Sequence, residues 1–227
     1  MKLVTSGGKP KPFSWSYSKL KNYESCPKRY FHIKVAKNVT EVPGDAATWG
    51  QTVHKYLEDR VRDATPLPEA VAHYEKLVAP LVSRPGKVIA EQQLAVNKDL
   101  QPTGWMAADT WCRGIIDVGI ISTSGKSAVL LDWKTGKRKP TEQLDLYANY
   151  IFHYHPEVNY VNTGFVWLKE RKIDWNVSKP DKKPFTRGEL PLIWQGFLPR
   201  VKKLESAYER DTWPVKTSGL CKAWCPV

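Results

Sequence analysis

The stretch AVLLDWKTGKRKP, residues 128–140, decides how the middle of this chain folds. Its apolar first half has the composition of a buried β-strand, and Gly136 and Pro140 mark an exit into a turn. Asp132 and Lys134 are two residues apart, so on a strand both side chains point to the same side of the sheet. The pattern fits a strand that ends at the surface with an ion pair, and it fits equally a strand that carries catalytic groups.

The composition is that of a globular protein with a large excess of positive charge. The chain has 227 residues, of which 41% are hydrophobic, enough for a sizeable core. Its 35 Lys and Arg against 23 Asp and Glu give a formal net charge of +12, which favours polyanionic partners and nucleic acid first. No apolar run approaches the roughly 20 residues of a membrane helix, and the first residues lack the apolar segment of a signal peptide. We therefore expect a cytoplasmic protein with no membrane association.

The hydrophobic pattern predicts a single α/β domain built in four parts. These are a flexible arm over 1–13, a helical part over 14–83, a sheet core over 84–178, and a C-terminal helix with a cysteine tail over 179–227. Within them we expect a helix starting at Ser14 or Ser16, further helices over 46–63, 68–83, 142–155 and 189–210, and strands over 87–97, 110–122, 127–134, 158–169 and 171–178. A central mixed β-sheet flanked by helices is the simplest architecture for this order.

Asp117 is the most unusual residue of the predicted sheet core. It interrupts the apolar strand RGIIDVGII, and a buried ionised carboxylate is costly unless it is paired or bound to a metal. If the strands 110–122 and 127–134 form a hairpin, Asp117 can lie beside Asp132, with Lys134 on the same face. The structural alternative is an ion pair between Asp117 and Arg113, which share a face of their strand.

Two further residues could complete a metal site. Glu91, in the apolar strand 87–97, is a candidate third carboxylate, and His54, on the helix 46–63, is a candidate fourth ligand. The alternative for His54 is an ordinary helix histidine. Mg²⁺ and Mn²⁺ take oxygen ligands, lower the pKa of a bound water and neutralise charge on a phosphate. With a lysine beside them to orient the nucleophile or stabilise charge, such residues favour hydrolysis of phosphodiester bonds.

Several separate motifs resemble one family of nucleases. GIID, ending at Asp117, and DWKTG, beginning at Asp132, resemble the RecB-like branch of the PD-(D/E)XK nucleases, which includes phage exonucleases, CRISPR-adaptation nucleases and AddB-type nuclease domains. SYSKLKNYESCPKRYF and WGQTVHKYLE resemble that branch's opening segment and its Gly-x-x-x-His helix, so the resemblance spans most of residues 16–150. It implies the catalytic residues Asp117, Asp132, Lys134, Gln143 and Tyr147, and the metal ligands His54, Glu91, Asp117 and Asp132.

The cysteines resemble part of a cluster-binding pattern found in a subset of that family. There, one cysteine before the nuclease core and three after it hold a [4Fe-4S] cluster. Cys26 resembles the first, and Cys221 and Cys225 resemble two of the last three, while the fourth is not in view. A [4Fe-4S] cluster takes four thiolates, so zinc or three unligated thiols are the alternatives. Cys112, on the strand 110–122, is expected in the core.

The function expected from these features is a Mg²⁺- or Mn²⁺-dependent deoxyribonuclease that trims DNA ends in recombination, repair or phage DNA processing. Lys137, Arg138 and Lys139 could hold the DNA backbone, or form an ordinary solvated turn. With no Gly-x-x-x-x-Gly-Lys-Ser/Thr loop, any helicase motor would be a separate partner. The alternatives are a nucleic-acid-binding module without catalysis, and a subunit whose Trp-rich face docks a recombinase or a single-strand annealing protein.

Overall fold

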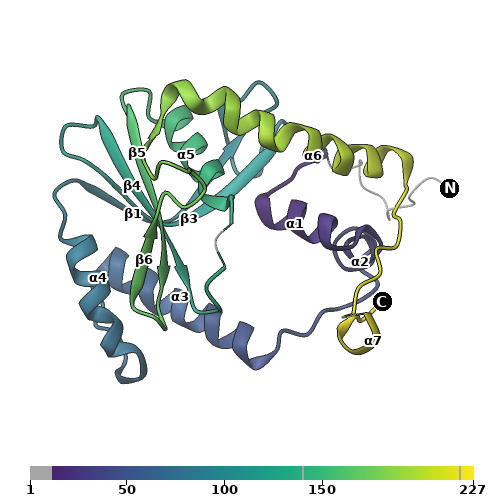
Figure 1. The fold of residues 1–227 in the computed structure, drawn as a ribbon, viewed down its shortest axis with the longest axis horizontal. Helices are drawn as coiled ribbons and strands as arrows, with labels where there is room; N and C mark the ends of the chain where they lie inside the picture. The colour runs from purple at the N-terminus through teal and green to yellow at the C-terminus, as the bar shows by residue number, and fades with distance from the viewer. Residues whose placement is uncertain (1–11, 140, 220) are drawn as a thin grey trace.

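The molecule is a mixed β-sheet flanked by helices, as the sequence predicts (Figure 1). The computed structural model describes residues 12–139, 141–219 and 221–227, so the arm predicted over 1–13 lies almost wholly outside the described residues. The described part includes no helix long and apolar enough to cross a lipid bilayer.

The sheet contains seven strands, and its centre is the predicted meander. The strands are β1 (Lys87–Val96), β2 (Pro102–Thr103), β3 (Cys112–Ile121), β4 (Ser127–Lys134), β5 (Tyr160–Trp167), β6 (Lys172–Trp175) and β7 (Phe185–Thr186). Their order is β2-β1-β3-β4-β5-β6, with β7 also pairing with β5. β4 and β5 run parallel, and the other pairs are antiparallel. A parallel pair needs a long crossover, which the helix between β4 and β5 provides.

The helices precede, interrupt and follow this sheet. They are α1 (Tyr17–Ser25), α2 (Pro27–Tyr30), the π-helix η1 (Phe31–Val35), α3 (Asp45–Asp63), the 3₁₀ helix η2 (Glu69–Tyr74), α4 (Glu75–Val82), α5 (Gln143–Tyr154), the 3₁₀ helix η3 (Arg187–Glu189), α6 (Leu190–Arg210) and α7 (Cys221–Trp224). Ser16 caps α1, because its hydroxyl accepts a hydrogen bond from the backbone N–H of Lys19. Of the two helix starts predicted from the sequence, Ser14 and Ser16, the structure uses Ser16.

One predicted helix is divided in the structure. The segment 68–83 forms η2 and then α4 instead of one continuous α-helix. Val71 and Tyr74 are buried at a spacing of three, and a 3₁₀ turn places residues three apart on one side. The apolar spacing of the segment therefore fits the tighter helix at its start and the α-helix after it.

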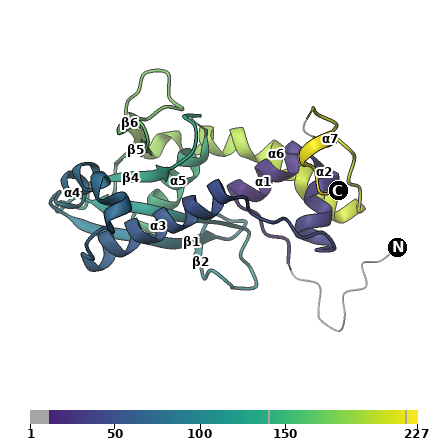
Figure 2. The ribbon, with the colours of Figure 1, turned by 90° about the horizontal axis from the view of Figure 1, so that it is seen from below.

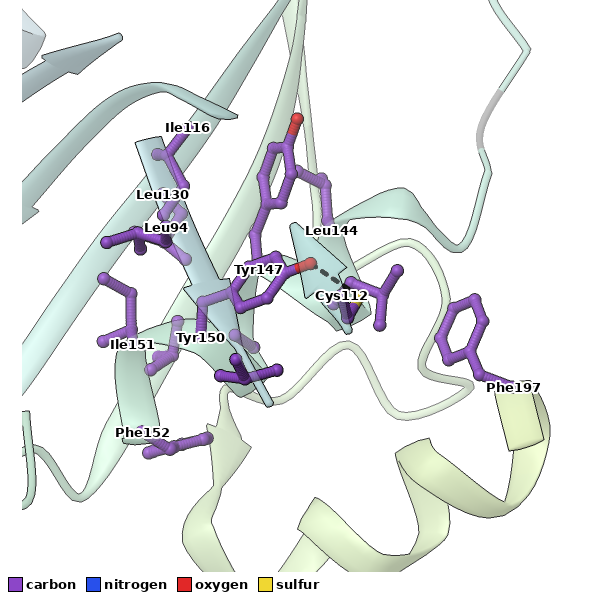
Figure 3. Packing of buried hydrophobic residues seen from close by; sticks show 14 of the residues in the cluster. Leu94, Cys112, Ile116, Leu130, Leu144, Tyr147, Tyr150, Ile151, Phe152 and Phe197 are labelled. Carbon is purple, nitrogen blue, oxygen red and sulfur yellow. Dashed lines mark hydrogen bonds between the residues drawn. The ribbon is translucent and has the colours of Figure 1, made fainter. Parts of the chain in front are cut away.

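Helices cover both faces of the sheet (Figures 1 and 2), and a hydrophobic cluster joins the helices to each face. The α3 cluster joins α3, η2 and α4 to one face and includes Val53, Leu57, Val118, Leu131 and Trp133. The α5 cluster joins α5, α6 and the N-terminal segment to the other face and includes Trp15, Leu94, Ile116, Tyr150 and Phe165. Figure 3 shows how side chains of α5 pack in the second cluster, where the Tyr150 hydroxyl lies 2.9 Å from the sulfur of Cys112.

The N-terminal segment is tied to both the sheet and the C-terminal helix. Trp15 pairs with the start of β3: its N–H donates to the carbonyl of Trp111, and its carbonyl accepts from the N–H of Arg113. Arg200, on α6, forms a bidentate ion pair with Glu24 of α1 and a second ion pair with Glu142, at the start of α5. These contacts fix α1 beside the sheet.

A buried polar stripe runs along α5. Asp145, Asn149 and His153 follow one another at a spacing of four, and each has a buried polar atom without a hydrogen-bond partner among the described residues. Burial raises the pKa of Asp145 to about 6, and the Ser178 hydroxyl offsets only part of this effect. Burying polar groups without partners costs stability, so this stripe is a weak point of the core.

Replacing Asp145 with Asn should stabilise the protein at neutral pH more than at acid pH. The pKa rises from 3.8 in the unfolded chain to about 6 in the folded protein, so the free energy of unfolding falls between these pH values as the pH rises and stays lower above them. Ionisation of the buried Asp145 therefore lowers the free energy of unfolding by about 3 kcal/mol at neutral pH. An asparagine does not ionise, so urea unfolding at pH 4 and pH 7.5 should show the gain of Asp145→Asn over the parent at the higher pH. An equal effect at both pH values would contradict this, and Asp181→Asn, in an exposed loop, is the control.

Candidate metal centre and cleft

The site is built where the pairing of β1 with β3 is interrupted. The register pairs Ala90 with Val118 and Gln92 with Ile116, which leaves Glu91 opposite Asp117 without a ladder pairing. Glu91 has a φ of +47°, in the left-handed region that side chains other than glycine rarely adopt. Holding a glutamate there costs roughly 1–2 kcal/mol. The strained residue breaks the ladder at the point where two carboxylates meet.

At this interruption, the alternation of side chains between the two faces of the sheet shifts in both β1 and β3. Val88 and Val118 pack in the α3 cluster, whereas Leu94 and Ile116 pack in the α5 cluster. Regular alternation would place residues an even number apart on the same face, so the alternation shifts by one residue along each strand. The guanidinium of Arg62 satisfies the carbonyl of Ala90, beside the break, with a hydrogen bond of 3.1 Å.

The pairing of β3 with β4 also ends beside Asp117. The last pair is Val118 with Leu131, and the same register places Asp117 opposite Asp132. Here the N–H of Trp133 donates to the side chain of Asp117, at 2.9 Å, instead of to a strand carbonyl. The predicted hairpin therefore brings Asp117 and Asp132 side by side, and a carboxylate replaces the backbone acceptor.

Three of the four predicted metal ligands converge on one point. One ligand atom each from His54, Glu91 and Asp117 lies within 4.8 Å of the others, and within the described residues no other set of three such side chains does so. Ligands about 2.1 Å from one ion are no more than about 4.2 Å apart, so this arrangement is close to what a divalent cation requires. Two carboxylates and an imidazole also form a suitable donor set for such an ion.

Asp132 lies beside this group without being part of it. Its side chain is 1% exposed, and its Oδ2 contacts the ammonium of Lys134. No described group donates a well-oriented hydrogen bond to that oxygen. A buried carboxylate with one contact has capacity for a further positive partner, so Asp132 also fits a place next to a cation.

The electrostatics of the group favour cation binding. Burial, and then the charge of Asp132, raise the pKa of Asp117 well above its usual range. Burial, and then the charge of Glu58, raise the pKa of Glu91. Burial lowers the pKa of His54, so its imidazole is neutral near pH 7 and has a lone pair to offer. The carboxylates repel one another, and a divalent cation would relieve that repulsion.

Lys134 is held by a chain of polar contacts that runs to α5. Its ammonium contacts Asp132 and donates to Oε1 of Gln143 at 3.3 Å. The amide of Gln143 in turn donates to the hydroxyl of Tyr147 at 2.6 Å, and Tyr147 is buried. Four of the five predicted catalytic residues are therefore connected, with Lys134 between Asp132 and α5, and Asp117 lies opposite Asp132 on the neighbouring strand.

Helix α3 approaches the sheet closely at Gly50. A β-carbon at this position would lie only 2.9 Å from Oγ1 of Thr135, the residue after β4. Glycine allows the helix to approach the end of β4, and His54, one turn further along α3, then reaches Asp117, with Nδ1 3.5 Å from Oδ2. The Gly-x-x-x-His spacing thus has a packing reason.

A cleft of about 700 Å³ leads to this group. Its walls come from the start of α1, from α3, from β1 and β3, and from α5, and its lining includes His54, Glu91, Asp117, Gln143 and Tyr147.

The described structure shows no ion pair between Asp117 and Arg113, so the structural alternative for Asp117 is not realised.

The basic turn after β4 separates into two kinds of residue. Arg138 forms a bidentate ion pair with Asp174 of β6, which also accepts from the indole N–H of Trp167. Lys137 and Lys139 are exposed, and neither forms an ion pair with a described residue. Lys137 and Lys139 are therefore available to an external anion, whereas Arg138 is engaged within the fold.

The C-terminal tail lies beside the N-terminal helices, with α7 next to α2 (Figures 1 and 2). The N–H of Lys28 donates to the carbonyl of Pro214, and Trp213 packs against Phe31. Hydrogen bonds from the backbone of Arg29 and Lys216, partly opposed by burial, lower the pKa of Cys26. In the described structure, the sulfurs of Cys26, Cys221 and Cys225 do not all lie within 4.8 Å of one another, so they form no compact single-ion site. The predicted cluster stays a prediction.

Some residues of the cleft were not singled out from the sequence. Glu58 lies one turn after His54 on α3 and lines the cleft, so the spacing of four could have revealed it. Trp105, Ser16 and Ser18 line it as well, but they come from a loop and a helix start far from the carboxylates in sequence. No local pattern connects them with the metal ligands.

Comparison with known proteins identifies the fold family. The sequence model of the PD-(D/E)XK nuclease superfamily matches residues 14–227. The chain belongs to this superfamily. Its members are metal-dependent nucleases, which agrees with the group formed by His54, Glu91 and Asp117.

The crystal structure of SSO0001 superposes with a TM-score of 0.47 at 12% sequence identity, over 96% of this chain and 85% of that one. No curated protein matches the sequence significantly.

Removing His54 should weaken Mn²⁺ binding more than Mg²⁺ binding. Imidazole is a better ligand for transition metals than for Mg²⁺, so the loss in His54→Ala should fall mainly on Mn²⁺. We expect at least about 1.4 kcal/mol for Mn²⁺, a factor of ten in Kd, by isothermal titration calorimetry. The exposed His73 provides the control His73→Ala. Unchanged affinity for both ions would show that His54 does not bind the metal, and equal losses would contradict the expected preference for Mn²⁺.

Proposed function

We propose that this chain is a Mg²⁺- or Mn²⁺-dependent deoxyribonuclease that acts on DNA ends. The observation that carries the proposal is the convergence of His54, Glu91 and Asp117, with Lys134 beside them, at a cleft in a protein of net charge +12. A polyanion is attracted to such a chain, and a cation held by these residues would activate the water that attacks a phosphodiester.

Each residue of the site has a role that follows from its contacts. His54, Glu91 and Asp117 would hold the cation, with Asp132 next to it. When bound, the cation supplies an activated water and neutralises charge on the scissile phosphate. Lys134, fixed by Asp132 and Gln143, presents an ammonium that stabilises negative charge on the phosphate or orients the attacking water. Tyr147 positions Gln143 and so acts through it.

The shape of the cleft supports action at an end. A volume of about 700 Å³ is in the range of sites that enclose small ligands. Such a volume suits a few nucleotides of one strand better than a continuous duplex. We infer an exonuclease in recombination, repair or phage DNA processing, with a single-strand annealing protein, a recombinase or a helicase as the class of partner that would supply or use its product.

Digestion of DNA with defined ends tests this proposal. End-labelled linear duplex, single-stranded DNA and covalently closed circles are incubated with Mn²⁺, Mg²⁺ or EDTA. We expect metal-dependent loss of linear DNA, with circles spared, and the order of label release will give the polarity. Asp132→Asn should abolish cleavage, whereas Asp63→Asn, at the exposed end of α3, should retain it. Cutting of circles would instead indicate an endonuclease.

Lys134→Ala should reduce the cleavage rate by about 10²-fold or more, because it removes a charged donor aimed at the reacting phosphate. DNA binding in EDTA should change little. If Lys134→Ala cleaved as fast as the parent, the catalytic role would be wrong. If no protein cleaved any DNA under either metal, a binding module or a docking subunit would replace the nuclease proposal.

The basic turn should contribute to binding through two of its three residues. Replacing Lys137 and Lys139 together by Ala should reduce the slope of log K against log salt by about 1.4–1.8, the share of two phosphate contacts. Arg138→Ala should change the slope less, because Asp174 neutralises this guanidinium. Fluorescence anisotropy over a range of salt concentrations measures both slopes, and equal slopes for all variants would exclude the turn from the interface.

A further inference from the structure

The cleft has a second polar region, around a residue of β3 that precedes Asp117 by four positions. It is formed by Arg113 at the start of β3, Trp105 in the loop before β3, and Ser16 and Ser18 at the start of α1. We refer to these four residues as the Arg113 subsite. The mechanism proposed above assigns no role to these four residues.

The side chain of Arg113 is held in place by neighbours that carry no negative charge. One guanidinium nitrogen donates to the hydroxyl of Ser14 at 3.1 Å, and the guanidinium lies 5.2 Å from the centre of the Trp105 ring. Another nitrogen meets the sulfur of Met106, a weak acceptor. The remaining one, Nε, is buried and has no hydrogen-bond partner among the described residues.

A second cation lies close to Arg113. The ammonium of Lys19 donates to the carbonyl of Ser14 at 2.9 Å. Burial, and then the positive charges of Arg113 and Lys37, lower the pKa of Lys19. Lys19 and Arg113 are therefore close enough for each to raise the positive potential that the other experiences.

No carboxylate balances these two charges. The described residues place no acidic side chain in an ion pair with Arg113 or Lys19, although they pair many other lysines and arginines. The residues outside the described ranges include no Asp or Glu. A partly buried guanidinium with unused donors and no counter-charge is suited to a bidentate anion such as a phosphate.

The subsite lies at a distance from the metal ligands that suits a DNA strand. Arg113 and Asp117 are both on β3, four residues apart, which corresponds to about 13 Å along a strand. One strand advances about 3.4 Å per nucleotide when stacked, and further when unstacked, so about two to four nucleotides cover this distance. Trp105 adds an aromatic surface on which an unpaired base can stack.

We propose that Arg113 and Lys19, with the hydroxyls of Ser16 and Ser18, form a phosphate-binding subsite for single-stranded DNA, about two to four nucleotides from the bond that is cleaved. The inference rests on the proposed function, and it adds the strand preference of the site. The phosphate is either the terminal phosphate of a strand end or an internal phosphodiester, and the test distinguishes them.

Binding without cleavage tests the subsite. Internally labelled (dT)₁₂ is prepared with a 5′-phosphate, with a 3′-phosphate and with neither, and a blunt hairpin serves as duplex. The full chain is titrated in EDTA, by fluorescence anisotropy at several salt concentrations. Arg113→Gln should weaken single-strand binding about tenfold and reduce the salt slope by about 0.7. Arg210→Gln removes the same charge from the exposed end of α6 and is the control.

A second variant, Ser18→Glu, separates a loss of DNA binding from a loss of the folded structure. Ser18 is exposed in the first turn of α1, where an acidic side chain is favourable to the helix. Ser18→Glu should therefore fold normally and still weaken binding, because it places a negative charge at the phosphate. Thermal unfolding of each variant confirms the fold.

The outcomes are separable. Equal weakening for all three oligonucleotides identifies an internal phosphodiester, and weakening confined to one phosphorylated end identifies a terminal phosphate; both support the subsite. Unchanged affinity and salt slope in both variants overturn it, and parent affinity for the hairpin equal to that for (dT)₁₂ overturns the strand preference. Metal-dependent cleavage by the parent, measured separately, shows whether the nuclease proposal still holds in either case.

Discussion

The structure depends on the repulsion between acidic side chains that meet inside a sheet. Glu91, Asp117 and Asp132 occupy adjacent strands at one level, and burial raises the pKa values of Glu91 and Asp117. A regular ladder would press these groups together with no compensating partner. Instead the pairing opens on both sides of Asp117, the N–H of Trp133 turns to its carboxylate, and Lys134 contacts Asp132. The opening that accommodates the charges also places Glu91 and Asp117 in the lining of the cleft.

Much of this arrangement could be predicted from the sequence. The meander, the crossover helix and the acid in an apolar strand are local features, and hydrophobic period and strand spacing reveal them. Asp117, Asp132 and Lys134 could be placed together because hairpin register follows from the hydrophobic pattern. The helix cap Ser16 and the closely packed Gly50 could also be recognised from the sequence.

Other features depend on contacts that no local pattern contains. The left-handed backbone of Glu91 is imposed by the strands around it, and no residue preference predicts it for a glutamate. The engagement of Arg138 with Asp174 joins residues 36 apart in sequence. An ion pair between Arg113 and Asp117 was the structural alternative because both lie on one strand, yet the guanidinium of Arg113 contacts Ser14 and Trp105, which lie outside that strand.

The ion pairs of Arg200 have a consequence for the order in which the molecule assembles. Arg200 reaches back across 176 residues to Glu24, and it also contacts Glu142. Contacts this distant in sequence form only after a large loop has closed, so they come late in folding. The sheet and α3 can associate through nearer contacts, whereas α1, whose start is tied to β3 through Trp15, gains its second anchor when α6 has docked. One wall of the cleft is therefore completed by a helix that contributes no residue to its lining.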